Sequence, residues 1–337
     1  MNGTLRITKV TICVPVYRVE KYIERCARSL FEQTYEDIEY IFVDDCSPDK
    51  SIEILCRVLE DYPARKEHVR IIYHDQNKGL SVVRNTAVDY CATEFLMHVD
   101  SDDWIDLNVV EACVKNQAET NADIVTFGVK RIVKGKEFLD EREWVDDVRE
   151  MTKHVIVKKA HNGVWGRLIR TSLYKEYGIK VEAGRGMSED LQVIPRLLYY
   201  SKKATFIGDV FYHYFLGNAN SYTASFSFEK FLETRMTYEV LERFFSGKDE
   251  ELRKAVIYRK VRGLAKNIVR CVKADAGKET YLRLKSFQDN DVLEYGGGLS
   301  FPDRMVFYIN NYALTKMYVR FASRIKIIIL QVVRRFK

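Results

Sequence analysis

Three carboxylates follow an apolar run in the stretch FLMHVDSDDWID, residues 95–106. In an extended segment residues i and i+2 point to one side, so Asp100 and Asp102 would share a face while Ser101 points away. Two neighbouring carboxylates repel unless one is protonated or a cation lies between them, and oxygen ligands suit Mg²⁺ or Mn²⁺. The alternative is an acidic helix start, with Asp102 and Asp103 in its first turn.

Further polar residues stand where they could meet a substrate. Asp44 and Asp45 end a second apolar run, IEYIFVDD, where a carboxylate could accept hydrogen bonds from a base or a ribose. Ordinary turn chemistry before Pro48 is the alternative there. Arg84 lies in NKGLSVVRN, and its guanidinium is suited to a forked contact with a phosphate or a base. A solvated helix face is the alternative for Arg84.

A third acidic segment, GRGMSEDLQ, lies far along the chain. Ser188 could cap a helix there, with Glu189 and Asp190 in its first turn, where acids are generally favoured. In the functional interpretation, the glycine loop delivers a general base, which must reach the hydroxyl that it activates. Two acidic strand ends, a basic loop and a distant acidic loop together suit a nucleotide-diphosphate substrate with a divalent cation.

The elements that carry these residues alternate along the first half of the chain. Ser47 is expected as the N-cap of the second helix, with Pro48 at its first position. Such alternation predicts an α/β fold with a mostly parallel sheet and helices on both faces, and ligands bind beyond the carboxyl ends of its strands. The predicted strands are 10–17, 38–45, 69–74 and 94–99, and the predicted helices are 19–33, 47–62 and 80–91.

Beyond about Ala122 the pattern loosens. Residues 122–133 read as a strand, 134–151 as an irregular polar segment, and 184–201 as a glycine loop that runs into a helix. A strand followed by a helix is expected over 163–179. After about Phe226 the chain becomes helical and charged, with a turn or linker at 295–300.

The composition limits the class of protein. With 337 residues, 47% hydrophobic and 30% charged, the chain is an ordinary globular protein. Its 7 cysteines form no CxxC pair and predict buried thiols in a reducing compartment. The N-terminus does not read as a signal peptide, and no apolar stretch reaches the roughly 18 residues of a transmembrane helix.

The positive charge lies at the C-terminus. Residues 304–337 contain eight Lys or Arg and no acid, whereas the whole chain carries only +6. A nucleic-acid footprint over the whole molecule is therefore not expected. In this tail Met317, Phe321, Ile325, Ile328 and Val332 are spaced as one helix face, beside a basic row of Lys316, Arg320 and Arg324. The spacing predicts a basic amphipathic helix on an anionic membrane surface, or alternatively one packed on the protein's own core.

Residues 11–51 and 77–105, which hold the motifs VPVY, VDDCSPD, NKGLSVVRN and VDSDDW, closely resemble family 2 glycosyltransferases. These are the inverting enzymes of bacterial polysaccharide and lipid-linked glycan assembly, and the resemblance covers roughly residues 8–225. It implies the GT-A fold, with a nucleotide-sugar-binding half (1–120) and an acceptor-side half (121–225), followed by a helical region (226–337).

The resemblance also implies roles for individual residues. Asp100-Ser101-Asp102 matches the family's DxD metal motif, with Asp102 the expected direct ligand of Mn²⁺ or Mg²⁺ and Asp103 a competitor. Asp190 matches the catalytic base, with Glu189 beside it. The remaining matches concern the nucleotide: Pro15 and Tyr17 at the base pocket, Asp44 and Asp45 at the base or ribose, and Arg84 on the loop that holds the nucleotide.

The implied activity is the metal-dependent, inverting transfer of one sugar from a nucleotide-sugar, at family level a UDP-sugar, to a hydroxyl of a glycan or lipid-linked acceptor. The expected location is cytoplasmic, peripheral on the inner face of the plasma membrane. The Gln-x-x-Arg-Trp signature of processive synthases is missing. An arginine common after the family's YxY strand is replaced by Phe215 and Leu216, and Lys78 stands where a second glycine is frequent.

Two alternatives to this activity remain. The first is a degenerate sugar-nucleotide-binding scaffold subunit, against which the intact Asp100, Asp102 and Asp190 argue. The second is a nucleotidyltransferase, which would be expected to carry a glycine-rich phosphate loop near the N-terminus, where VPVYRVE has none.

Overall fold

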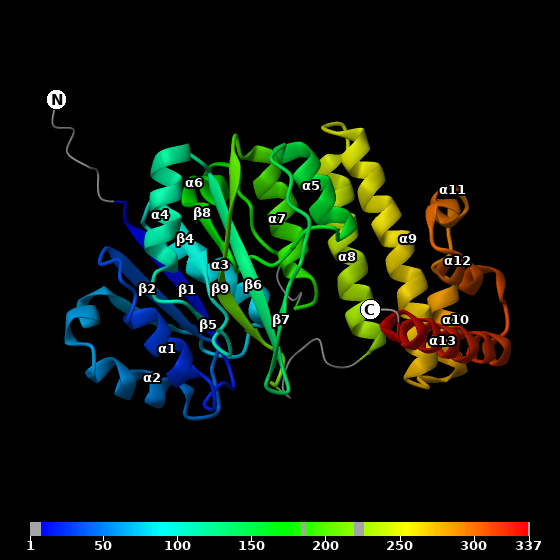
Figure 1. The fold of residues 1–337 in the computed structure, drawn as a ribbon, viewed down its shortest axis with the longest axis horizontal. Helices are drawn as coiled ribbons and strands as arrows, with labels where there is room; N and C mark the ends of the chain where they lie inside the picture. The colour runs from blue at the N-terminus through cyan, green and yellow to red at the C-terminus, as the bar shows by residue number, and fades with distance from the viewer. Residues whose placement is uncertain (1–7, 183–185, 219–225, 336–337) are drawn as a thin grey trace. The chain divides into compact units, whose positions relative to one another are not determined.

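The computed structural model describes residues 8–182, 186–218 and 226–335, with side chains as far as Arg324 in the last helix. The chain forms two compact units, Met1–Ala224 and Ser225–Lys337. The division falls one residue before the expected boundary after residue 225. Figure 1 shows the elements of both units.

The first unit alternates strands and helices, as the sequence predicts. In chain order it contains β1 Val10–Val16, α1 Ile23–Phe31, β2 Ile38–Asp44, α2 Ser51–Glu60, the 3-10 helix Pro63–His68, β3 Val69–Tyr73, α3 Leu80–Tyr90, β4 Phe95–His98, β5 Trp104–Ile105, α4 Val109–Thr120, β6 Ile124–Val133, β7 Lys136–Leu139, α5 Val148–Val157, β8 Arg167–Arg170, α6 Thr171–Glu176, α7 Glu189–Tyr200 and β9 Ala204–Phe215.

The described strands form one sheet in the order β3-β2-β1-β4-β8-β6-β9-β5, with β7 paired to β6. From β3 to β4 all pairs are parallel. The strand β8 then runs antiparallel to both β4 and β6, while β9 runs parallel to β6. The α/β fold is thus confirmed, and its parallel half is the part that the strand–helix alternation predicts.

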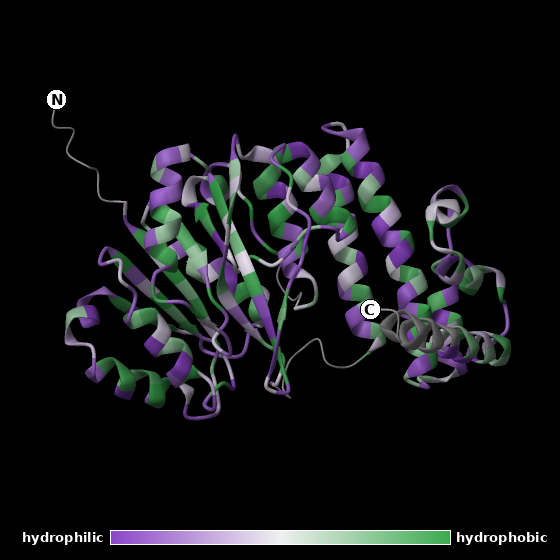
Figure 2. Cartoon of the chain, viewed as in Figure 1, coloured by the Kyte–Doolittle hydropathy of each residue, from purple (hydrophilic) through white to green (hydrophobic). Residues whose placement is uncertain are grey.

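The central strands are buried because they consist mainly of β-branched and aromatic residues, which fit a pleated surface covered on both sides. Val10, Ile12 and Val14 in β1 and Phe42 in β2 are fully buried. In Figure 2 the helices alternate between hydrophobic and hydrophilic residues, as expected for helices with one face against a core.

The parallel pairing brings three loops to one edge of the sheet. β1 ends at Val16, β2 at Asp44 and β4 at His98, and the register pairs Val16 with Asp44 and Cys13 with His98. The residues that follow these strands therefore share an edge, as predicted. This edge is where ligands bind in open α/β sheets.

Two element predictions are wrong. The helix α2 begins at Ser51 rather than at Ser47, because the Ser47 hydroxyl instead accepts from the Arg18 amide (2.8 Å) and donates to Asp49 (2.7 Å). Residues 134–151 are not simply irregular, since they contain β7 and the start of α5. That helix is capped by Asp147, which accepts from the Glu150 amide at 2.7 Å.

The second unit is helical. Its core gathers around one face of α9, with Val261, Leu264 and Ile268 among the buried residues. In the described part of the chain no helix has the length and hydropathy needed to cross a membrane. Its elements are α8 Phe228–Phe245, α9 Glu250–Lys273, α10 Gly277–Lys285, α11 Asn290–Tyr295, the 3-10 helix Gly296–Gly298, α12 Phe301–Tyr308 and α13 Tyr312–Arg335.

Candidate active site

The acidic residues after β4 lie in a turn. The amide of Asp103 donates to the carbonyl of Asp100 over 3.0 Å, and β5 begins at the next residue. The prediction of an extended segment, with Asp100 and Asp102 on one face, is therefore wrong. The helix-start alternative is also wrong, because α4 begins only at Val109. Ser101, between the two acids, is buried.

The first two acids of the turn have different partners. Asp100 Oδ1 accepts from Arg84 Nη2 at 3.0 Å, and Asp102 Oδ2 accepts from the amide group of Asn218 at 2.8 Å. Burial, followed by the charge of Asp100, raises the pKa of Asp102 above its ordinary value. Among the described residues, no cation forms an ion pair with the Asp102 carboxylate.

The third acid, Asp103, is bound by the fold itself. It is 0% exposed, and its two carboxylate oxygens accept from the Tyr212 hydroxyl and the Phe215 amide, each at 2.7 Å. Both donors belong to β9. These bonds leave Asp103 a weaker candidate than Asp102 for binding a ligand.

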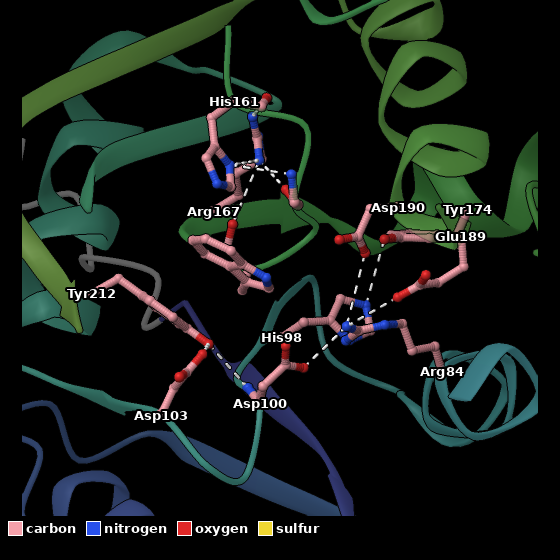
Figure 3. A network of polar contacts seen from close by, with 12 residues as sticks. Arg84, His98, Asp100, Asp103, His161, Arg167, Tyr174, Glu189, Asp190 and Tyr212 are labelled. Atoms are coloured by element: carbon pink, nitrogen blue, oxygen red, sulfur yellow. Dashed lines mark hydrogen bonds and ion pairs between the residues drawn. The ribbon is translucent and has the colours of Figure 1, made fainter. Parts of the chain in front are cut away.

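Arg84 joins acids from distant parts of the chain (Figure 3). Its side chain is 4% exposed, and its Nη2 atom lies 3.0 Å from Asp100 Oδ1, 3.6 Å from Glu189 Oε1 and 3.8 Å from Asp190 Oδ1. The Nε and Nη1 atoms of Arg84 are buried without a hydrogen-bond partner among the described residues. Three carboxylates thus face one guanidinium that still has donors for an anionic ligand.

Glu189 and Asp190 both have pKa values above those of ordinary carboxyl groups. Burial is the largest cause of a raised pKa for both carboxyl groups. The Arg84 charge opposes this effect in both, and an amide hydrogen bond from Val164 lowers the pKa of Asp190 further. Asp190 Oδ1 is buried and accepts no hydrogen bond from the described residues. A carboxylate with a raised pKa and a free lone pair can act as a general base.

The sequence predicts Ser188 as the cap of a helix. The structure agrees that α7 begins at Glu189, but Ser188 has φ 65° and its side chain makes no capping hydrogen bond with the described residues. The acids are instead placed by the contacts of Arg84 and by Asn85, whose amide group exchanges hydrogen bonds of 2.7 and 2.9 Å with the backbone of Val181. These bonds join α3 to the segment that leads to α7.

A buried arginine that the sequence prediction did not assign shapes the loop opposite α7. Arg167 is 1% exposed and donates to the carbonyls of His161, at 2.6 Å, and Gly163. Burial lowers the pKa of Arg167 to about 10, while the charge of Asp190 acts to raise it. Arg167 lies in the segment VWGRLIR, residues 164–170, and nothing local in the sequence indicates that its partners are backbone carbonyls.

His98 is a second buried residue that the sequence prediction treated only as part of a strand. It lies in β4, 1% exposed, with the Tyr174 hydroxyl 3.5 Å from its Nε2 atom. Burial and the nearby charge of Arg84 lower its pKa to about 3. His98 is therefore neutral, and Arg84 rather than His98 supplies the positive charge that faces the three carboxylates.

The acids at the end of β2, Asp44 and Asp45, form hydrogen bonds with other residues of the protein. Asp45 is 2% exposed, with Oδ1 2.7 Å from His74 Nδ1 and 2.9 Å from the Lys78 amide, and Oδ2 2.8 Å from the Gly79 amide. Asp44 accepts from the Ser47 amide at 2.9 Å. Asp45 thus holds the loop that precedes α3 and Arg84. Since a carboxylate offers about four acceptor positions, these three bonds leave one position unused among the described residues.

The loop after β1 lines an open pocket, whereas Pro15 and Tyr17, predicted at the base pocket, are not among its lining residues. Pro15 is half-buried, and the Tyr17 ring is 38% exposed, with the Arg18 guanidinium 5.3 Å from its centre. The pocket has a volume of 380 Å³ and reaches Asn218, the partner of Asp102. Its lining residues are Arg18, Glu20, Lys21, Tyr22, Pro48, Asp49 and Asn218.

The residues present fit a hard divalent cation with few protein ligands. In the described part of the chain, no cluster of three or more His, Cys, Asp or Glu side chains surrounds one point. Asp102 offers a carboxylate without a paired cation in that part of the chain, beside the charge of Asp100. Mg²⁺ and Mn²⁺ accept such a site, because they commonly use one or two carboxylates and take water and phosphate oxygens as their other ligands.

Residues 11–178 match the family described as glycosyl transferase family 2. The chain belongs to this family. It is 30% identical over 224 residues to "Glycosyltransferase GlyA" of Streptococcus pneumoniae, a match that covers 61% of this chain and 30% of that protein. It is 33% identical over 196 residues to "Uncharacterized glycosyltransferase EpsJ" of Bacillus subtilis, covering 55% of this chain and 54% of that protein. The chain therefore spans only about a third to a half of these two relatives.

Solved structures agree on the fold of this family member. S. aureus TarS 1-349 in complex with UDP-GlcNAc aligns with a TM-score of 0.60 at 18% identity, covering 87% of this chain and 93% of that one. The same TarS fragment without the ligand gives a TM-score of 0.63 at 16% identity, over 94% of this chain and 91% of that one. The GT-A fold expected from the motifs is thus confirmed.

Proposed function

We propose that the protein is an inverting, metal-dependent glycosyltransferase of cell-surface polysaccharide synthesis. It transfers one sugar from a nucleotide-sugar, a UDP-sugar, to a hydroxyl of a glycan or lipid-linked acceptor. The observation that carries the proposal is the contact of Arg84 with Asp100, Glu189 and Asp190. It joins the proposed donor side of the site to the proposed base.

The chain's own residues divide the work. Pro15 and Tyr17 border the nucleobase, Asp44 and Asp45 contact the base or ribose, and Arg84 directs buried donors toward phosphate oxygens. Asp100, Ser101 and Asp102 hold the diphosphate end of the donor, with Asp102 the main ligand of Mn²⁺ or Mg²⁺ and Asp100 beside it. When bound, that cation supplies positive charge that stabilises the departing diphosphate.

The chemical step forms one bond and breaks another. The acceptor oxygen attacks the anomeric carbon as the bond from that carbon to the diphosphate oxygen breaks, through an oxocarbenium-like transition state. Asp190 takes the proton of the acceptor hydroxyl, because its carboxylate has a raised pKa and an oxygen that no described residue occupies. Attack opposite the leaving group inverts the anomeric configuration. Glu189, next to Asp190, holds its proton and keeps the site from gaining another negative charge.

One fold relative supports the choice of a UDP-sugar and another supports the choice of cation. TarS has a crystal structure in complex with UDP-GlcNAc, and the mannosyltransferase PcManGT of Pyrobaculum calidifontis, with a TM-score of 0.50, has a structure in complex with GDP-Man and Mn²⁺. The test is release of nucleoside diphosphate from a panel of UDP- and GDP-sugars with Mn²⁺, in the presence and absence of glycan acceptors. Release that requires the metal supports the proposal, whereas binding without turnover of any donor would favour a scaffold role.

We also infer that α13 contacts an anionic membrane from the cytoplasmic side. Thr315 and Val319 face the core of the second unit, at 0% and 4% exposed. The other face presents Leu314, Met317 and Phe321 to solvent, each more than half exposed. This exposure favours membrane contact over packing of that face on the core. Ile325, Ile328 and Val332, predicted on the same face, lie outside the described side chains.

The charges beside this face suit lipid phosphates. Arg320 and Arg324 are exposed, whereas Lys316 lies 2.6 Å from Asp275. Truncating residues 304–337 would remove Val306, Phe307 and Val319 from the core, so point variants give the cleaner test. M317S/F321S should sediment less with phosphatidylglycerol vesicles than the wild type, while L293S, which changes an 83% exposed leucine of α11, should not. Equal sedimentation of all three proteins would contradict membrane contact through α13.

A further inference from the structure

A tyrosine in β9 connects the two sides of the site. Tyr212 is 0% exposed, and its hydroxyl accepts from the Asp100 amide at 3.1 Å while it donates to Asp103 at 2.7 Å. One hydroxyl thus holds both ends of the acidic turn, whose Asp103 amide also donates to the Asp100 carbonyl. Figure 3 shows the hydroxyl of Tyr212 between these two acids.

The ring of Tyr212 packs on the opposite side of the site. It stacks on Trp165, with ring centroids 4.6 Å apart and an interplanar angle of 17°. Trp165 lies in the loop that Arg167 shapes, and the amide of the preceding residue, Val164, donates to Asp190. A short series of contacts therefore runs from the Asp100 amide through Tyr212 and Trp165 to the backbone beside Asp190.

We propose that Tyr212 is a positioning residue, whose hydroxyl fixes the acidic turn and whose ring sets that turn relative to the loop that holds Asp190. The inference rests on the proposed function in that the turn is taken to bind the cation and the donor. It goes beyond that function because Tyr212 and Asp103 are given no role in binding substrate or metal, and their side-chain oxygens form hydrogen bonds within the protein. Side chains that orient a binding group through hydrogen bonds commonly change ligand affinity or activity about 10–100-fold when removed.

Tyr212→Phe tests the hydroxyl, because it keeps the ring and its stacking on Trp165. Its matched control is Tyr40→Phe, since Tyr40 is also 0% exposed, but its hydroxyl donates to the Leu30 carbonyl, at 2.9 Å, away from the acidic turn. Binding of UDP in the presence of MnCl₂ is measured by calorimetry, and stability by urea unfolding. Y212F should weaken binding about tenfold. Y40F should lose comparable stability and bind as the wild type does.

Trp165→Phe tests the ring contact. It keeps both hydroxyl bonds of Tyr212, so binding of UDP with MnCl₂ should stay within about twofold while kcat falls about tenfold or more, because the loop beside Asp190 moves. Unchanged UDP binding by Y212F, or an equal loss in Y40F, would overturn the inference and leave the proposed function intact. Absence of UDP binding by the wild type would instead contradict the proposed function, and the positioning role with it.

Discussion

The Asp190 Oδ1 atom lies 3.8 Å from Arg84 Nη2 and has no hydrogen-bond partner among the described residues. The separation is short enough for a strong charge interaction but too long for a hydrogen bond. Asp190 can therefore stay ionised in a buried site while keeping a lone pair for the acceptor hydroxyl. The chemistry that we propose depends on this balance between burial, which raises the Asp190 pKa, and the Arg84 charge, which lowers it.

Removing the Arg84 charge should move the pH dependence of transfer. Arg84→Gln leaves the burial of Asp190 but removes the charge that lowers its pKa, so the acid limb of the kcat profile should shift to higher pH. Donor binding should weaken, and the protein should lose about 3–5 kcal/mol of stability, because buried acids lose their partner. The control is Arg28→Gln, since Arg28 pairs with Glu24 and Asp61 at the surface. An acid limb that does not move would show that Asp190 does not carry the titration.

The titration of Glu189 should lower the free energy of unfolding as the pH rises. Burial, followed by the charge of Asp190, raises its pKa above the ordinary value of 4.5, so the folded state holds the proton more tightly than the unfolded state does. The contribution of Glu189 to the free energy of unfolding should be greatest below pH 4.5 and should fall as the pH rises through the raised pKa. The fall amounts to about 1.4 kcal/mol for each pH unit that separates the folded-state pKa from the unfolded-state pKa.

Glu189→Gln removes this titration while keeping a side chain of the same shape. Urea unfolding of the wild type and of the variant at pH 5 and pH 8 gives the comparison. The free energy of unfolding of the variant, relative to that of the wild type, should be higher at pH 8 than at pH 5. A constant difference would mean that Glu189 titrates alike in the folded and unfolded states.

Replacing Asp102 and Asp103 one at a time should distinguish the proposed metal ligand from the acid that holds the turn. Asp102→Asn should abolish the Mn²⁺ dependence of UDP binding, because it removes the carboxylate that we propose as the main metal ligand. Asp103→Asn should reduce affinity only about tenfold, because Asp103 acts through its bonds to Tyr212 and Phe215. Manganese titration followed by electron paramagnetic resonance reports free Mn²⁺ directly. A larger loss in the Asp103 variant than in the Asp102 variant would reverse the assignment.

The sequence predicts the parts of this site that depend on strand ends. Apolar runs followed by acids identify β2 and β4, and parallel pairing brings Asp45 and Asp100 to one edge. The roles of the acids depend on partners that no local pattern reveals. Asp103 looked like a competitor for the metal because its donors, Tyr212 and Phe215, lie more than a hundred residues away in β9.

The wrong predictions have local causes as well. Strand alternation predicts an extended segment at the acidic turn, because it does not reveal the hydrogen bond from the Asp103 amide to the Asp100 carbonyl. Ser47 and Pro48 resemble a helix start in sequence. In the structure the Ser47 hydroxyl accepts a hydrogen bond from the Arg18 amide, in the loop after β1. Ser47 therefore does not cap the helix, which begins only at Ser51.

The central claim is that Asp190 accepts the proton of the acceptor hydroxyl. The most direct test compares the wild type with Asp190→Asn, in calorimetric binding of UDP with MnCl₂ and in single-turnover sugar transfer from a donor found in the nucleotide-sugar panel. Asp89→Asn, at an exposed aspartate that pairs with Lys180, is the control. We predict that the Asp190 variant binds UDP as the wild type does and that its transfer rate falls at least about 100-fold. Transfer at the wild-type rate by that variant would contradict the claim.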